Sequence, residues 1–464
     1  MSNDHQQGEP APRRRLVPCI IIFVLGVGSL LPWNFFIIAS QYFQRRLAAE
    51  PSTTSGGGGY SYELWMPLAA NLPLVVSSLL NCLCTSGCGR GLPAALRRCC
   101  GRGLPAAPCG SCDLKHCPLV VSTMVLISGL FAATAVLVDV DMEPRIFFYV
   151  TMATIVVINM SNGVLVGSLF GVVSLLFQQH LRWFMIGQGA SGLIAALVML
   201  VSILSGVPEQ AYFIIPCVVA AVTLACYLCL GMSPRTHTHG DGVDSPQQDS
   251  QEPPGSTEMT ALSNSSEAPE DQRRDENQER CSGWRVFKEI RWMAAYVMAV
   301  FIVTLSVFPV ITSRVQTVSK DNAAWDKVFT CVCCLIVFNA MDLLGRIATI
   351  FVQWPSKESR WLPIAVASRG LFVPLLIMCN VQNFRSPAVF RSDGFFAFIM
   401  ALFAVSNGYL ASLCEAYAPR LVRGADCEAA GLVMSLFMVL GLSLGAFLSF
   451  WYMRVLSCDL SSSH

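Results

Sequence analysis

The chain has 464 residues, of which 54% are hydrophobic and only 13% are charged, and its formal net charge is +1. Its mean hydropathy of +0.54 is far above that of a soluble globular protein, which excludes a soluble domain and predicts an integral membrane protein. A net charge this close to zero gives no sign of a nucleic-acid partner, and the partner that the composition predicts is the lipid bilayer.

Apolar segments of about 18 residues or more are long enough to cross a bilayer as helices, and the sequence contains eleven of them. They are 16–40, 64–84, 118–138, 147–177, 183–206, 211–232, 292–312, 328–352, 362–380, 394–416 and 429–457. Eleven spans exclude a seven-helix receptor. The expected fold is an all-α polytopic membrane protein with eleven transmembrane helices in a 6+5 arrangement of two bundles, 16–232 and 292–457. By analogy, this is the major-facilitator arrangement with one helix missing, which places a substrate at the bundle interface near the midplane.

Basic residues around the first two spans predict the orientation of the chain. Arg13, Arg14 and Arg15 precede the first span, and the loop after the second carries Arg90, Arg97, Arg98, Arg102 and Lys115. By the positive-inside rule, the tail 1–15 is cytosolic and, after eleven crossings, the tail 458–464 is extracellular. The first span is longer than a signal-peptide core and has no small-residue cleavage site, so we expect it to be retained.

The first span ends in the sequence LLPWNFF, which places Pro32, Trp33 and Asn34 within an apolar helix. A membrane helix tolerates proline where neighbouring helices or a cavity satisfy the freed carbonyl group. Trp33 alone would also suit the aromatic belt at the membrane surface. The adjacent amide of Asn34 favours a cavity that both side chains line.

The loop 85–117 contains a cluster of cysteines and a tandem repeat, because GRGLPAA occurs at 89–95 and again at 101–107. Cys109, Cys112, His116 and Cys117 have part of the spacing of a zinc site. The rest of the loop lacks that spacing, so the preferred interpretation is that its cysteines are free or reversibly palmitoylated. We expect neither a metal ion nor, in a reducing compartment, a disulfide.

Small residues recur at helical spacing in several spans and predict close contacts between helices. They are Gly163, Gly167 and Gly171 in the fourth span, Gly187, Gly189 and Gly192 in the fifth, and Gly441 and Gly445 in the eleventh. Packing is the preferred role for these residues. Helices that slide during transport need the same small contacts, so the two roles are compatible.

The segment 233–291 is rich in Ser, Pro, Gln, Asp and Glu and contains no long apolar stretch before Trp284. Such a composition cannot form a core, so we predict a disordered cytosolic loop between the two bundles. Its last part, WRVFKEIRW at 284–292, has the pattern of a short interfacial helix that leads into the seventh span.

Polar side chains interrupt the eighth span at Asn339, Asp342 and Arg346. An ionised side chain at bilayer depth costs roughly 2.5–3.5 kcal/mol, so such residues usually face a bundle interior or a polar path. Their spacing puts all three on one helical face, where Asp342 and Arg346 can pair. Two interpretations remain: this face binds a polar solute, or the ion pair only holds helices together. For Arg369 in the ninth span, we prefer a role in fixing two helices.

The residues expected at several kinds of catalytic site are missing from the membrane part. The chain has no GK dipeptide and hence no Walker A loop, and its six histidines are predicted to lie in loops or tails. Asp342 is the only acid placed well inside a span, because Glu415 lies near the predicted end of a helix. We therefore expect no catalytic residues, no cofactor and no metal, and the chain is not predicted to be an enzyme.

Several sequence blocks resemble those of the equilibrative nucleoside transporter family (solute carrier family 29), and they occur in the family's order across nearly all of the membrane part. They are PWN at 32–34, GSLFG at 167–171, GQG at 187–189, FN-x-x-D-x-x-GR at 338–346, WPSKESRWLP at 354–363, SNGYLASL at 406–413 and GLSLGAFLSF at 441–450. The family has eleven helices, a cytosolic amino terminus and a large cytosolic loop between helices six and seven.

The resemblance implies a nucleoside substrate, with Asp342 and Arg346 holding the ribose. It places further side chains around the cavity, and the candidate substrate-binding set also contains Trp33, Asn34, Leu74, Asn162, Val166, Phe308, Asn339 and Leu442. Gly163, Gly167, Gly187 and Arg369 are the candidate packing or gating residues. Two positions depart from the family: Val166 stands where a Gln is common and Asn162 where a Gly is usual, so the accepted bases are open.

The function that the resemblance implies is facilitative transport of nucleosides by alternating access without sodium or ATP, with nucleobases as a further candidate substrate class. The implied location is the plasma membrane. A second hypothesis is a non-transporting membrane receptor or scaffold that keeps the carrier fold. The changes at Val166 and Asn162 are compatible with either hypothesis.

Overall fold

The computed structural model describes residues 12–38, 43, 62–85, 118–137, 140, 142–175, 178–205, 210–232, 283–319, 321–382 and 389–456. The predictions for the cysteine-rich loop between 86 and 117, for 233–282, for residues 1–11 of the amino-terminal tail and for the tail 458–464 lie outside these residues. Within them every regular element is a helix, apart from two isolated β-bridges, Val315 with Val381 and Cys379 with Phe390.

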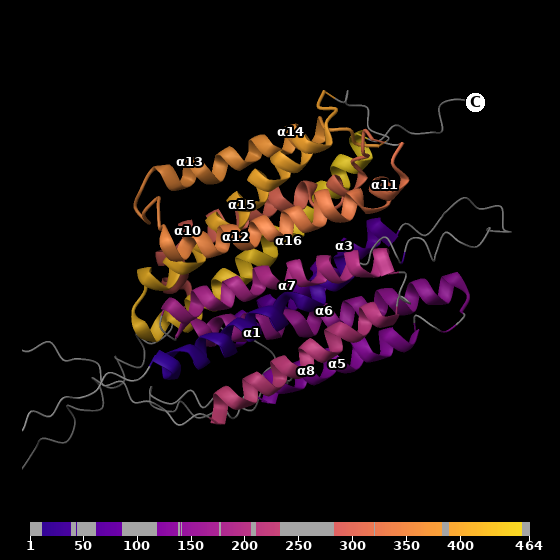
Figure 1. The fold of residues 1–464 in the computed structure, drawn as a ribbon. Coiled ribbons are helices and arrows are strands. Elements are labelled where there is room, and N and C mark those ends of the chain that lie inside the picture. Colours follow the sequence, from indigo (N-terminus) through magenta and orange to yellow (C-terminus); the bar gives the residue numbers. More distant parts are fainter. Residues whose placement is uncertain are drawn as a thin grey trace, which may run out of the picture.

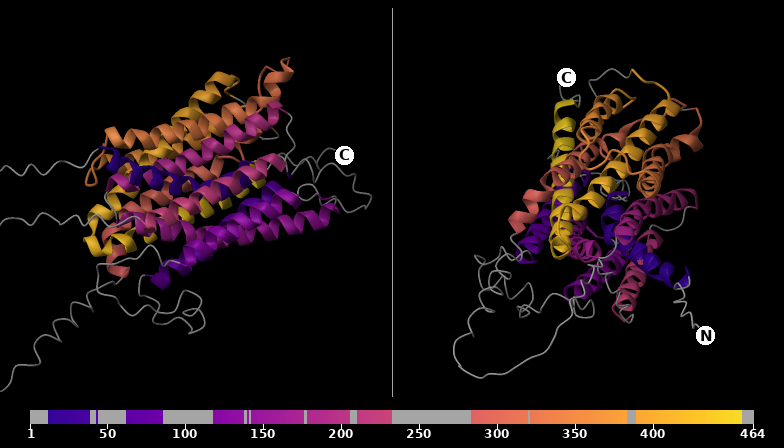
Figure 2. Two further views of the ribbon diagram at one scale, coloured as in Figure 1. Left: turned by 60° about the horizontal axis from the view of Figure 1, so that its bottom comes forward. Right: turned by 90° about the vertical axis from the view of Figure 1, so that its left-hand side faces the viewer.

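Among the described residues, the N-terminal half contributes the helices α1 (Pro12–Ile38), α3 (Tyr62–Thr85), α5 (Pro118–Leu137), α6 (Pro144–Ser174), α7 (Gln178–Ser205) and α8 (Gln210–Met232). The C-terminal half contributes α10 (Gly283–Val307), η3 (Thr312–Arg314), α11 (Ala323–Phe329), η4 (Thr330–Ile336), α12 (Val337–Phe351), α13 (Trp361–Ser368), η5 (Arg369–Leu371), α14 (Phe372–Ile377), α15 (Asp393–Tyr417), η6 (Ala418–Leu421), η7 (Gly424–Asp426) and α16 (Cys427–Leu456). Figure 1 and the right-hand view of Figure 2 show the helices of each half grouped together, with α7 beside α12 at their boundary.

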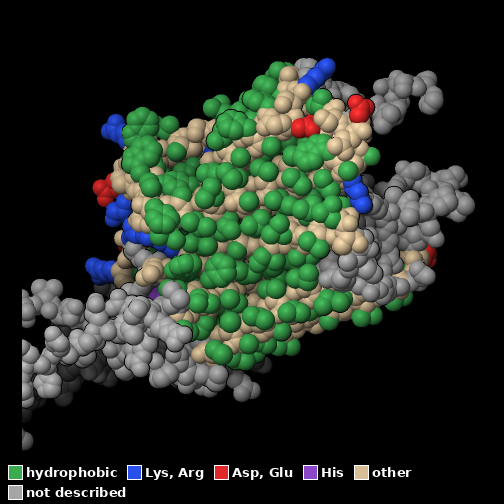
Figure 3. All heavy atoms as spheres, viewed as in Figure 1, with side chains coloured by type: hydrophobic (Ala, Val, Ile, Leu, Met, Phe, Trp, Pro, Cys, Tyr) green, Lys and Arg blue, Asp and Glu red, His purple; other side chains and the backbone are tan. Residues whose placement is uncertain are grey.

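The chain is a multi-pass membrane protein. Among the described residues, eight helical segments are long and apolar enough to cross a bilayer, and three shorter apolar helices cover Ala69–Leu83, Ile214–Cys229 and Trp361–Ile377. Together these segments are compatible with the eleven predicted spans. Hydrophobic side chains cover the middle of the face in Figure 3, whereas charged side chains gather at its two ends, as expected for a surface in contact with lipid.

Glycines allow the two halves to approach each other at the α7–α12 boundary. A Cβ atom on Gly187 would overlap the backbone of Phe23 in α1, whereas one on Gly189 would lie 2.6 Å from Cδ of Arg346 in α12. One on Gly192 would overlap Oδ1 of Asn339. The GQGASG stretch of α7 therefore packs on α1 with one glycine and on α12 with the next two.

The ridge of glycines on α6 also contacts two partners. A Cβ atom on Gly163 would meet Ser77 and the carbonyl oxygen of Leu74 in α3. One on Gly171 would lie 3.3 Å from Glu428 in α16, and one on Gly167 would lie between α3 and α16. The small residues of α6 thus join a helix of the N-terminal half to one of the C-terminal half.

Three predicted boundaries differ from the structure. The segment 284–292 is not a separate interfacial helix but the first part of α10, because Val286 and Ile290 on one face are buried against the rest of the molecule. The helix α10 ends at Val307 rather than at residue 312, two residues before Pro309, which cannot donate a helix hydrogen bond. His180, predicted to lie in a loop, is in the first turn of α7.

The eighth and ninth spans are less regular than a single predicted helix. The eighth passes from α11 through the π-helical turns of η4 into α12, and π-helical turns are frequent at functional sites. The ninth is divided by η5 into α13 and α14. Pro374 leaves the carbonyl group of Gly370 without its usual helix partner, which accounts for the break.

Candidate functional site

The centre of the site is an ion pair within α12. Nε of Arg346 donates a hydrogen bond of 2.8 Å to Oδ2 of Asp342, one helical turn away. Both residues are buried, with 6% of Asp342 and 5% of Arg346 exposed, and Asn339 on the same face is also buried. The predicted pairing of these side chains on one helical face is therefore present in the structure.

The other carboxylate oxygen of Asp342 is held by α15. Nδ2 of Asn407 donates a hydrogen bond of 2.7 Å to Oδ1 of Asp342. The two helices pack closely here because both lack side chains at the contact: a Cβ atom on Gly408 would overlap the carbonyl oxygen of Asp342, and one on Gly345 would overlap that of Val405. The SNGYLASL block thus supplies Gly408, which allows α12 to pack closely, and Asn407, whose amide orients Asp342.

Arg369 joins this network through Asn407. Its guanidinium group donates to Oγ1 of Thr304 at 2.8 Å and to Oδ1 of Asn407 at 3.4 Å, and Thr304 also donates to Asn407. Further donors reach the carbonyl oxygen of Phe403 and the hydroxyl of Ser406. Arg369 is 1% exposed, and within the described residues its hydrogen bonds tie the ninth span to α10 and α15.

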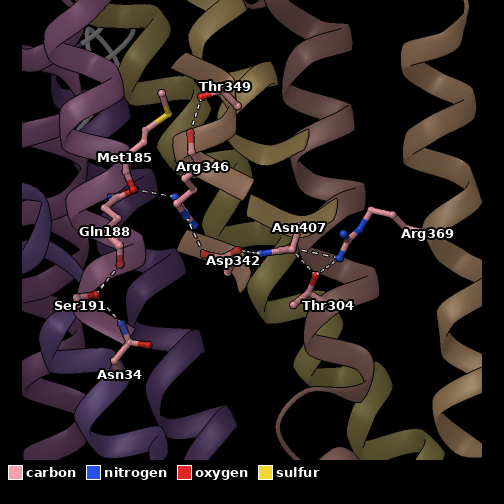
Figure 4. Close-up of polar contacts among 10 residues, drawn as sticks. All are labelled: Asn34, Met185, Gln188, Ser191, Thr304, Asp342, Arg346, Thr349, Arg369 and Asn407. Carbon is pink, nitrogen blue, oxygen red and sulfur yellow. Dashed lines mark hydrogen bonds and ion pairs between the residues drawn. The ribbon is translucent and has the colours of Figure 1, made fainter. Parts of the chain in front are cut away.

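On its other side, Arg346 reaches across to the N-terminal half. Nη1 of Arg346 donates to the carbonyl oxygen of Met185 in α7 at 3.2 Å. Polar contacts then continue along α7, where Ser191 donates to the carbonyl oxygen of Gln188 and accepts from Nδ2 of Asn34 in α1 at 2.8 Å. Figure 4 shows the resulting row of polar groups from Asn34 to Arg369, which passes through both halves of the molecule.

Glu415 is a buried acid that the sequence predicted to lie near the end of a helix. It lies in α15, is 1% exposed, interacts electrostatically with Arg346, and its Oε2 has no hydrogen-bond partner in the described structure. The signal that could have found it is its spacing of eight residues from Asn407, which places both on one face of α15. The buried ionisable residues around α12 therefore include two acids and two arginines.

A second group of the predicted residues lies where α3, α6 and α16 meet. Leu74, Val166, Asn162 and Leu442 are all buried. Ser443, which follows Leu442, donates to the carbonyl oxygen of Asn71 in α3 at 3.3 Å. Neither amide atom of Asn162 has a hydrogen-bond partner in the described structure, although only 1% of the residue is exposed.

The two predicted aromatic residues belong to different surroundings. The ring of Phe308 stacks on that of Phe338 in α12 at 3.8 Å between centroids, and Phe338 lies 5.9 Å from Phe403, so Phe308 is part of an aromatic cluster in the C-terminal half. Trp33 is partly buried in α1, and its indole nitrogen has no hydrogen-bond partner in the described structure.

The arrangement has a chemistry suited to hydrogen bonding with a solute. It offers a carboxylate, a guanidinium group and several amides within apolar helices, all able to exchange hydrogen bonds with a neutral polar solute. The described residues contain no group of three or more His, Cys, Asp or Glu side chains placed to hold a metal ion.

Comparison with known proteins places this architecture in a family. The family model described as "Nucleoside transporter" matches residues 152–454. The chain is 37% identical to human equilibrative nucleoside transporter 2, over 94% of this chain and 97% of that protein. It is 34% identical to human equilibrative nucleoside transporter 1, over 98% of this chain and 100% of that protein. The chain belongs to the equilibrative nucleoside transporter family.

The family assignment confirms the resemblance that the sequence motifs indicated. The relatives in this family are transporters, not enzymes. Solved structures show the same fold at low identity. The human organic anion transporter MFSD10 matches with a TM-score of 0.57 and 11% identity, over 96% of this chain and 94% of that one. The major facilitator superfamily proton:xylose symporter XylE matches with a TM-score of 0.54 and 13% identity, over 95% and 89%. The predicted all-α, major-facilitator-like fold is confirmed.

Proposed function

We propose that this protein transports nucleosides across a membrane by facilitated diffusion, with the substrate bound between the two bundles beside Asp342 and Arg346. The observation that carries the proposal is the buried Asp342–Arg346 pair at the α7–α12 boundary in a chain that belongs to the equilibrative nucleoside transporter family. Buried charges are costly in a membrane and usually serve a function.

The hydrogen-bond inventory of the pair supports recognition of a sugar. Among the described residues, each oxygen of Asp342 has one hydrogen-bond partner. A carboxylate oxygen accepts about two hydrogen bonds, so acceptor capacity remains for hydroxyl groups. Arg346 uses Nε and Nη1 for Asp342 and Met185, and its other N–H groups remain as donors. Vicinal hydroxyl groups, which both donate and accept, match this combination.

For the remaining substrate contacts, we assign the base to the apolar side chains Trp33, Leu74 and Leu442, and we assign Val166 and Phe308 to the lining of the same cavity. Asn34, Asn162 and Asn339 provide amides, of which that of Asn162 has no hydrogen-bond partner among the described residues. Gly163, Gly167 and Gly187 provide the close helix contacts and Arg369 fixes the ninth span. These roles rest on the family resemblance and on the burial of each residue.

Alternating access requires contacts between the two halves that are strong enough to close one side and weak enough to open again. The hydrogen bond from Arg346 to the Met185 carbonyl is of this kind, because a hydrogen bond to a charged group contributes about 1.5–3 kcal/mol net. The divided bundles, 16–232 and 292–457, would then rock about the site. On the family resemblance we place the protein in the plasma membrane, and on the distribution of basic residues we place its amino terminus in the cytosol.

The experiment is uptake of radiolabelled uridine and adenosine by cells that lack endogenous nucleoside carriers. The proposal predicts saturable uptake above that of vector-transfected cells, and slower uptake by Asp342→Asn at equal surface abundance. Uptake indistinguishable from vector, with the wild type present at the cell surface, would favour the alternative of a receptor or scaffold that keeps the carrier fold.

A further inference from the structure

A second polar cluster lies at the end of the molecule where α7 begins and α12 and α15 end. Arg420 in η6 is held there by two neighbours: Nη1 donates to Oε1 of Gln353 at 3.1 Å, and the guanidinium group lies over the ring of Tyr417 at 5.6 Å. Tyr417 in turn donates to the carbonyl oxygens of Gln353 and Pro355. The position of Arg420 is therefore fixed by the C-terminal half before any ligand arrives.

The N-terminal half brings a second arginine to the same place. Arg182 lies in the second turn of α7 and interacts electrostatically with both Arg420 and Tyr417. Among the described residues, neither guanidinium group has a carboxylate within ion-pair distance, and Arg182 makes no hydrogen bond. Nε of Arg420 is buried and has no hydrogen-bond partner in the described structure.

Two cations that have no counter-ion among the described residues repel each other across a boundary, and an anion between them is attracted by both. Guanidinium groups match the oxygen atoms of phosphate in spacing and hydrogen-bond direction. An uncharged nucleoside would not neutralise either group. The cluster is also distinct from the Asp342–Arg346 pair, because Arg346 uses its contacts within α12 and with Met185.

We propose that Arg182 and Arg420 form a site for a phosphate group, either free in solution or on a lipid headgroup, that joins the two bundles at this end. The phosphate oxygens accept hydrogen bonds from the guanidinium groups of Arg182 in α7 and Arg420 in η6. A bound phosphate replaces repulsion between the halves by two attractions, so it stabilises the arrangement in which the two arginines lie together. This site does not depend on the identity of the transported solute.

The first experiment measures the thermal unfolding midpoint of the purified full-length protein in detergent at constant ionic strength, with inorganic phosphate replacing chloride. We expect phosphate to raise the wild-type midpoint by roughly 2–4 °C and to leave Arg182→Gln and Arg420→Gln unchanged. The matched control is Arg423→Gln, which removes an exposed arginine three residues from Arg420 and should keep the full rise. Loss of the rise in the control as well would overturn the proposal in favour of general charge screening.

A second measurement separates the two sources of phosphate. The same midpoints are compared in nanodiscs of phosphatidylcholine alone and of phosphatidylcholine with phosphatidic acid. A rise with phosphatidic acid but not with inorganic phosphate assigns the site to a lipid headgroup, and a rise with inorganic phosphate assigns it to the free anion. No wild-type rise with either probe overturns the proposal.

The repulsion itself is testable without a ligand. In phosphate-free buffer, Arg182→Gln should unfold at a higher temperature than the wild type, because it removes one of two like charges. A lower midpoint would mean that Arg182 makes a stabilising contact that its position does not suggest, and would overturn the proposal.

Discussion

Asn407 donates a hydrogen bond of 2.7 Å to Oδ1 of Asp342, the carboxylate whose other oxygen accepts from Arg346. Asn407 lies 65 residues along the chain from Asp342, on α15 rather than α12. The acid at the centre of the proposed site is therefore held from two helices. Its orientation depends on how they pack, not on the Asp342–Arg346 spacing alone.

Replacing Asn407 should weaken transport through Asp342. We expect Asn407→Ala to reduce uptake roughly tenfold or more. The change removes the hydrogen-bond partner that Asp342, Thr304 and Arg369 share, and leaving buried polar groups without a partner costs about 1–3 kcal/mol. The matched control is Thr304→Val, which removes a contact to Asn407 but leaves the Asn407–Asp342 bond. Initial rates of uridine uptake per surface molecule compare the two, and an equal loss in both would contradict an orienting role for Asn407.

A change at Asp342 should affect sugar hydroxyl groups most. Asp342→Asn keeps the shape and one acceptor oxygen but removes the charge that faces Arg346. We expect uptake of ribonucleosides to fall more than that of 2′,3′-dideoxynucleosides, because the latter lack the hydroxyl groups that the carboxylate would accept. The measurement is the ratio of the two uptake rates at normal surface abundance. An unchanged ratio would indicate that the pair only holds helices together.

The contact between α12 and α15 should not tolerate a side chain at Gly408. A Cβ atom there would overlap the carbonyl oxygen of Asp342, which is backbone and cannot rotate away. Overpacking of this kind typically costs about 1–3 kcal/mol, so Gly408→Ala should reach the surface in reduced amounts. The control is Gly129→Ala in α5, where the added Cβ atom would have no neighbour within 4 Å among the described residues. Surface labelling should show normal amounts for this control, and a similar loss in both variants would argue against the tight contact.

The long polar segment between the bundles is predicted from composition to be dispensable. Deleting residues 240–280 and rejoining the ends should leave uptake largely intact, because a segment that cannot form a core contributes little to the fold. Uptake and surface abundance of the deletion are measured beside the wild type. Loss of uptake at normal abundance would give this segment a role beyond that of a tether.

Contacts set by spacing within one helix could be predicted from the sequence, whereas contacts between distant helices could not. The face with Asn339, Asp342 and Arg346 was evident from intervals of three, four and seven residues. Met185 could not be predicted, because its contribution is a backbone carbonyl group that any residue carries. The burial of Glu415 was missed because the residue lies close to the end of α15. The chain continues there as η6, so a position near the helix end is not a position near the surface.

The boundaries that differed have similar local causes. The start of α10 is extended by Val286 and Ile290, whose burial depends on neighbours that a hydropathy window does not see. The division of the ninth span at η5 was indicated by Gly370 and Pro374, but a hydropathy average hides both residues. The arginines of the inferred phosphate site, Arg182 and Arg420, are 238 positions apart, so only the fold brings them together.

The central claim is that this chain carries nucleosides through the boundary that Asp342 and Arg346 occupy, driven only by the substrate gradient. The direct test is radiolabelled uridine uptake by the purified protein in liposomes without ATP or a sodium gradient. We predict that the wild type brings internal uridine up to, and not above, its external concentration, and that Asp342→Asn does so far more slowly. Accumulation above the external concentration, or equal rates for the two proteins, would contradict this claim.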